Sequence, residues 1–147
     1  MTTDLSPQDL ACLNECRAVA MENSRFYARA YDAATDPHDQ TLIGSAAAQR
    51  KVFVEAMSAI LAGSDCAPAK PSHNSPKGLI IELPAALILT SSVEFKTMAR
   101  KHEEQFHKAL KHGIEYIKDE TTREVLKHHL MAAKIATKAL IQAHIVD

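Results

Sequence analysis

The chain has few aromatic residues, no tryptophan and almost no net charge. Aromatic residues make up 5% of its 147 residues, and 17 Lys and Arg residues nearly balance 18 Asp and Glu residues. Scarce aromatic side chains offer little surface on which nucleic-acid bases can stack. Balanced charge provides no basic patch for nucleic acid or for an anionic membrane. We therefore expect neither nucleic acid nor a membrane among the partners of this protein.

The chain also lacks a long, uninterrupted apolar run. Residues 79–89 (LIIELPAALIL) are almost wholly apolar, but Glu82 and Pro84 interrupt them and the stretch is too short to span a bilayer. Residues 1–4 do not show the basic and then apolar pattern of a secretory signal peptide. These absences predict a cytoplasmic protein.

Cysteine is rare as well, with Cys12, Cys16 and Cys66 as its three occurrences. In a cytoplasmic protein we expect free thiols rather than disulfides. Cys12 and Cys16 lie one helical turn apart, a spacing that suits a soft-metal or redox site. We favour the simpler interpretation, in which both are small buried apolar residues.

Apolar residues at helical spacing are plentiful. Four segments show this pattern, at about residues 6–34, 38–61, 84–118 and 122–145, and a Pro-rich linker occupies about 63–78. Ser6 followed by Pro7 is a typical helix start, because the Ser side chain can accept a backbone hydrogen bond and Pro needs no donor there. Pro37 separates the first two segments, since Pro cannot continue a helix. The sequence therefore predicts four helices.

Residues 1–147 are predicted to form a single domain, because the chain is long enough to bury a core and neither half looks able to fold alone. Two antiparallel helical hairpins joined by a long connection form a four-helix bundle with one crossover, which is the ferritin-like plan. The predicted fold class is thus all-α, a ferritin-like four-helix bundle with a long Pro-rich crossover.

Three polar residues, Arg50, His102 and His129, fall on the predicted apolar faces, and Glu103 lies at the edge of one. A buried guanidinium must find an anion or reach water, because an unpaired charge in a core is costly. Glu103 is the natural partner, since the planar fork of Arg matches a carboxylate. One interpretation of this buried polar cluster is therefore an Arg50–Glu103 pair that fixes which helices face each other.

The alternative interpretation is a metal site. Glu103, with His102 and His129, supplies carboxylate and imidazole groups of the kind that bind a single divalent metal. Iron or manganese would be the cofactor, and the protein would then be a metal-dependent oxidase or ferroxidase.

A complete di-iron site is not expected. Glu104 and His107 form one E-x-x-H string, but di-iron bundles need a second such string and a Glu from each of the other two helices. The chain has no second string, and helical spacing directs Glu104 away from the apolar face. Glu22 and Glu55, on the first two segments, fall at or beyond the edges of their apolar arcs.

A third hypothesis concerns His107. The stretch around it loosely resembles the phosphorylatable helix of histidine phosphotransfer domains, in which Leu, Lys and Gly follow the His at two, three and four residues. Here Leu110, Lys111 and Gly113 follow at three, four and six residues, so the register differs. An exposed basic helix face is the better explanation.

The chain resembles an uncharacterised bacterial family of ferritin-like four-helix bundles, distant relatives of rubrerythrins. The resemblance lies in residues 48–50 (AQR), 99–104 (ARKHEE) and 122–126 (TREVL). It implies a fold and the positions of the Gln-Arg and acidic pairs, but no activity. The chain departs from the family at Glu104, where the acidic pair usually ends in Asp, and in a shorter linker.

No catalytic residue set emerges, so we expect a non-catalytic oligomeric or structural protein, or a stress-related one. Surplus apolar residues predict a homodimer, since contiguous exposed apolar area usually marks an interface. These residues are Ile80, Ile81, Leu87, Ile88, Leu89, Leu130, Ile141 and Ile145.

Overall fold

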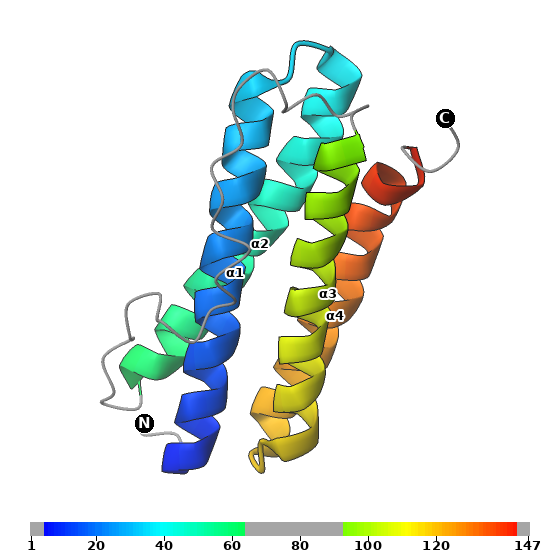
Figure 1. The fold of residues 1–147 in the computed structure, drawn as a ribbon. Coiled ribbons are helices and arrows are strands. Elements are labelled where there is room, and N and C mark those ends of the chain that lie inside the picture. The colour runs from blue at the N-terminus through cyan, green and yellow to red at the C-terminus, as the bar shows by residue number, and fades with distance from the viewer. Residues whose placement is uncertain (1–4, 64–92, 144–147) are drawn as a thin grey trace.

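The computed structural model describes residues 5–63 and 93–143, and this part of the chain is all-helical with no strand (Figure 1). Its four helices are α1 (Pro7–Ala33), α2 (Pro37–Gly63), α3 (Val93–Tyr116) and α4 (Glu120–Ala143). The prediction of an all-α, four-helix protein is therefore confirmed. No helix within these residues combines the length and apolar content needed to cross a membrane.

The first helix begins where the sequence predicts. Ser6 Oγ accepts a hydrogen bond from the backbone N–H of Asp9 at 3.1 Å, and Pro7 occupies the first helical position. Asp9 is itself buried, and its Oδ1 accepts a hydrogen bond from the backbone N–H of Lys118 at 3.1 Å. This contact ties the turn between α3 and α4 to the start of α1.

The other helix ends differ slightly from the predicted ones. Helix α2 begins one residue earlier, after Asp36, and α4 begins two residues earlier, after Asp119. The reason is capping: Asp36 Oδ1 accepts from the backbone N–H of His38 at 2.8 Å, and Asp119 Oδ2 from that of Thr122 at 2.9 Å. Helix α3 ends at Tyr116, two residues early. Helix α2 ends at Gly63, two residues later than predicted, so the linker predicted at 63–78 begins one residue too early. The predicted helical residues 84–92 and 144–145, and residues 64–78 of the linker, lie outside the described residues.

The helices form two antiparallel hairpins, α1 with α2 and α3 with α4, packed side by side (Figure 1). Helix α1 packs on α2 and α3, and α4 packs on α2 and α3. In Figure 1, α1 and α4 run upward while α2 and α3 run downward. The end of α2 and the start of α3 therefore lie at opposite ends of the bundle.

The buried apolar residues of the described part of the chain form two clusters. The lower cluster is centred on Leu13, Phe53, Phe106, Leu110 and Leu126, and it draws on all four helices. The upper cluster is centred on Phe26, Ile43, Phe95 and Met98.

Gly113 allows close packing within the lower cluster. A Cβ atom at this position would lie 2.9 Å from Leu126 Cδ1 and 3.5 Å from Cys16 Sγ. A side chain at this position would force Leu126 of α4 to shift, while the contact to Cys16 of α1 would be an ordinary one.

Candidate functional site

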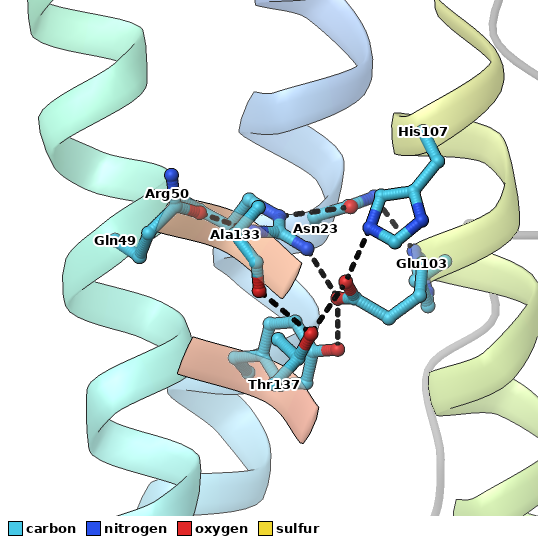
Figure 2. A network of polar contacts seen from close by, with 9 residues as sticks. Asn23, Gln49, Arg50, Glu103, His107, Ala133 and Thr137 are labelled. Atoms are coloured by element: carbon cyan, nitrogen blue, oxygen red, sulfur yellow. Dashed lines mark hydrogen bonds and ion pairs between the residues drawn. The ribbon is translucent and has the colours of Figure 1, made fainter. Parts of the chain in front are cut away.

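A layer of polar side chains lies between the two apolar clusters and is contributed by all four helices (Figure 2). We call it the polar layer, and its six members are buried. They are Asn23, Tyr27, Arg50, His102, Glu103 and Thr137.

Arg50 is the centre of the polar layer and is wholly buried. Its Nη2 donates to Glu103 Oε2 in an ion pair, its Nη1 donates to Gln49 Oε1, and its Nε donates to Asn23 Oδ1 at 3.3 Å. The Phe106 ring lies against the guanidinium, with its centroid 3.9 Å from Cζ, a cation–π arrangement. The Arg50–Glu103 pair expected from the sequence is therefore present, and each donor nitrogen of the guanidinium has a partner.

Glu103 accepts hydrogen bonds on both carboxylate oxygens. Tyr27 donates its hydroxyl to Oε2 at 2.5 Å, beside the bond from Arg50. Thr137 Oγ1 lies 3.0 Å from Oε1 and 2.8 Å from the backbone carbonyl oxygen of Ala133, so its single proton is shared between two acceptors (Figure 2). His107 Nε2 lies 3.4 Å from the same Oε1. Because these partners come from all four helices, this one carboxylate links α3 to each of the other three helices.

The electrostatics favour an ionised Glu103. Burial by itself would raise the pKa of this carboxyl, but the contact with His107 and the charge of Arg50 outweigh burial and hold the pKa below its ordinary value. The pKa of Tyr27 is raised well above its ordinary value, first by burial and then by the negative charge of Glu103. At neutral pH the carboxylate is therefore charged and the phenol keeps its proton.

His102 is buried and neutral. Burial is the main reason that its pKa falls to about 4, and the nearby charge of Arg50 contributes in the same direction. Since Arg50 can only donate, Asn23 Oδ1 must accept, so Asn23 Nδ2 faces His102 Nδ1 at 3.0 Å and donates to it. The proton of His102 is therefore on Nε2, which has no hydrogen-bond partner in the described residues. The ring stacks on Phe26 at a centroid distance of 4.4 Å.

The metal-site hypothesis does not fit this geometry. His129 is not in the polar layer: it is half-buried, and its ring meets the edge of Phe53 at 5.1 Å. Burial and neighbouring His128 lower its pKa. His102 uses Nδ1 to accept from an amide, and Glu103 is bound to a cation and two hydroxyls. Within residues 5–63 and 93–143 no three His, Cys, Asp or Glu side chains are grouped as metal ligands, so Glu103, His102 and His129 do not form the predicted set.

The residues of the di-iron argument are placed partly as predicted. Glu55 and Glu104 are exposed. Glu22 is buried, so its prediction was wrong. The reason is that α1 packs against both α2 and α3, and its buried face is wider than the single apolar stripe from which the position of Glu22 was predicted.

His107 also differs from expectation. The basic-face explanation places it in solvent, whereas its side chain is only 24% exposed and turns toward Glu103, one helical turn earlier. Its neighbours Glu104, Lys108 and Lys111 are exposed, so His107 lies at the edge of the outward face of α3 and not on it.

The expectation that Cys12 and Cys16 are free thiols is confirmed. Cys16 is 1% exposed, its Sγ donates to the carbonyl oxygen of Ala109 at 3.3 Å, and burial raises its pKa to about 12. A thiol with this pKa is almost never a thiolate at neutral pH, so Cys16 acts as a buried apolar residue. Cys66 lies outside the described residues.

Sequence reasoning missed the neutral members of the polar layer. Neither Tyr27 nor Asn23, one turn before it, was identified as a site residue. Thr137 was also missed, although it follows the apolar Ala133 by four residues. A search for polar residues at core positions, rather than for ionisable ones, would have found Asn23 and Thr137.

The polar layer borders solvent between α3 and α4. Glu103, His107 and Thr137 lie at the bottom of an open groove of about 420 Å³. The exposed side chains of Arg100, Glu104, Lys134 and Lys138 line its sides.

No family model, curated protein or solved structure matches the chain. The resemblance to ferritin-like bundles therefore stays a prediction, and the functional argument depends on the geometry of the protein itself.

Proposed function

We propose that this protein is a non-catalytic helical bundle of the ferritin-like plan, which acts in the cytoplasm as a homodimer in a structural or stress-related role. The observation that carries the proposal is the state of Glu103. This residue is the best candidate for a metal ligand or an acid–base group in the bundle. Its carboxylate is already bound by Arg50, Tyr27 and Thr137, so little capacity is left for a metal or a substrate.

The helix directions support the ferritin-like plan. Residues 64–92 have to join the end of α2 to the start of α3, and these ends are at opposite ends of the bundle (Figure 1). Two antiparallel hairpins with these ends at opposite ends of the bundle are the arrangement of helices found in the ferritin-like plan.

Exposed apolar side chains support the homodimer. Ile135 is 73% exposed and Met131 is 67% exposed, and both lie on α4. Of the residues from which the dimer was predicted, Leu130 is half-buried, and the side chains of the others lie outside the described part. Paired large apolar residues in water favour association.

The experiment is elemental analysis of protein purified without chelator, together with a Glu103→Gln variant and light scattering at micromolar concentration. We expect no stoichiometric iron, manganese or zinc, a dimer mass, and a Glu103→Gln variant that is less stable. Stoichiometric metal that disappears in a folded Glu103→Gln variant would contradict the proposal and favour the oxidase hypothesis. A monomer mass would contradict the homodimer.

A further inference from the structure

The outward face of α4 changes in character along the helix. Glu120 and Glu124 lie near its start, Met131 and Ile135 near its middle, and Lys138 near its end, and all five are exposed. At 100° per residue, the positions from Glu124 to Lys138 keep within about 40° of one line along the helix. The stripe is therefore acidic, then apolar, then basic, with exposed His128 at its edge and exposed Lys127 beside it between Glu124 and Met131.

This stripe is complementary to itself when two copies run antiparallel. Glu124 precedes Met131 by seven residues and Lys138 follows it by seven, which is about 10 Å on either side at 1.5 Å per residue. A two-fold axis beside Met131 would place Glu124 of each copy opposite Lys138 of the other. A parallel arrangement would instead place like charges opposite each other.

The surface of α4 also has room for the partner. A shallow hollow on its first half is lined by Glu124, Val125, His128 and His129 among others. In the antiparallel arrangement, Ile135 of the second copy lies level with Lys127, beside His128 at the edge of this hollow. Glu124 Oε1 lies 3.2 Å from Lys127 Nζ on the same helix. The Glu124 side chain is still 64% exposed, so its carboxylate can accept a second cation.

We propose that α4 is the homodimer interface, and that it pairs with α4 of a second copy in an antiparallel, two-fold arrangement centred on Met131. This inference depends on the homodimer of the proposed function and specifies its surface. The apolar centre supplies affinity, and the charged ends determine the direction of pairing, because oppositely charged side chains across an interface fix its register.

Charge exchange tests the arrangement. Glu124→Lys alone, and Lys138→Glu alone, should each raise the dimer dissociation constant by about tenfold or more, because each creates two like-charge pairs across a two-fold interface. Mixing the two single variants should restore the dimer as a heterodimer, since every pair is then of opposite charge. The double variant Glu124→Lys/Lys138→Glu should also dimerise. Analytical ultracentrifugation at low ionic strength measures all of these.

Glu115→Lys is the matched control, since Glu115 is an exposed glutamate on α3, outside the stripe. It should leave the dissociation constant unchanged, and circular dichroism should show native helix content in every variant. A wild-type dimer that none of the α4 exchanges weakens would overturn this inference and leave the homodimer of the proposed function intact. A monomeric wild type would overturn both. Weakening without recovery on mixing would rule out the antiparallel register.

Discussion

The lower cluster and the polar layer are both buried, but they are held together differently. Phe53, Leu110 and Leu126 of the lower cluster are 0% exposed, and so is Arg50 of the polar layer. The apolar cluster is stabilised by burial and close packing, which are not directional. The polar layer is stabilised only while each donor keeps its acceptor, because an unpaired buried group carries its full desolvation penalty. We therefore expect the lower cluster and the polar layer to respond very differently to substitution, although they are equally buried.

The sharpest test of this difference is to remove one charge from the polar layer. Arg50→Met keeps an apolar stem but leaves Glu103 buried without its cation. We expect a loss of about 3–5 kcal/mol in the free energy of unfolding, as for other broken buried pairs. Urea denaturation measures it.

The double variant Arg50→Met/Glu103→Leu distinguishes a lost charge from lost packing. It should recover most of the stability of the wild type, because apolar replacement of a whole buried pair is often neutral or stabilising. If the double variant is no more stable than Arg50→Met, the charge of Glu103 is not the source of the loss.

Acid should destabilise the protein through the titratable groups of the polar layer, because the lower cluster is apolar. His102 titrates near 6.5 in the unfolded chain and at about 4 in the folded protein, so between these pH values only the unfolded chain binds the proton. The free energy of unfolding is therefore not reduced by His102 above about pH 6.5. It decreases as the pH falls from about 6.5 toward 4, by about 3 kcal/mol in all, because each unit of pKa difference corresponds to about 1.4 kcal/mol. The depressed pKa of Glu103 acts in the same direction at lower pH.

Urea denaturation at a series of pH values measures this dependence. A His102→Gln variant is the control, because it removes the titrating group and should flatten the slope between pH 6.5 and 4. An equal slope in that variant would show that another group causes the acid sensitivity.

Removing a single hydrogen bond should have a smaller effect. Tyr27→Phe keeps the ring in place and deletes the 2.5 Å hydrogen bond to Glu103 Oε2. We expect a loss of about 1.5–3 kcal/mol, which is typical of a hydrogen bond to a charged group. The pKa of the Glu103 carboxyl should rise, since this bond helps to hold it down. The chemical shift of the Glu103 carboxyl carbon, followed through a pH titration, measures this pKa. An unchanged pKa in Tyr27→Phe would contradict the hydrogen bond between Tyr27 and Glu103.

The smallest effect is expected in the lower cluster. Leu110→Met nearly conserves the side-chain volume at a fully buried position. We expect it to lower the free energy of unfolding by less than about 1.5 kcal/mol, which thermal unfolding measures. A Leu110→Ala variant provides the scale, at about 2–5 kcal/mol. If Leu110→Met lowers the free energy of unfolding as much as Arg50→Met does, the polar layer is not more sensitive to substitution than the lower cluster.

Much of the architecture was predictable from the sequence because helix signals are local. Ser6 and Pro7 begin α1 as predicted, since a cap depends on residues within three positions of one another. The predicted starts of α2 and α4 were one and two residues late, because the capping roles of Asp36 and Asp119 were not recognised. Periodicity likewise identified Arg50 and His102 as inward-facing.

The contents of the polar layer were less predictable. Helical periodicity shows that a residue faces inward, but not which residue on another helix it meets. Glu103 was paired correctly with Arg50 by charge alone. His129 was grouped with them by its inward position, yet it packs against Phe53 outside the layer, and Asn23 and Thr137 carry no charge that would have indicated their role.

Local backbone preferences and the cost of burying an unpaired charge can be read from the chain alone. They suffice to predict four helices with buried apolar faces and an interior guanidinium that must find an anion or reach water. The contacts of Glu103 with Tyr27 and Thr137, and the neutral state of His102 with its proton on Nε2, became clear only from the folded arrangement. Those outcomes depend on distances between side chains of different helices, and no spacing along one helix contains them.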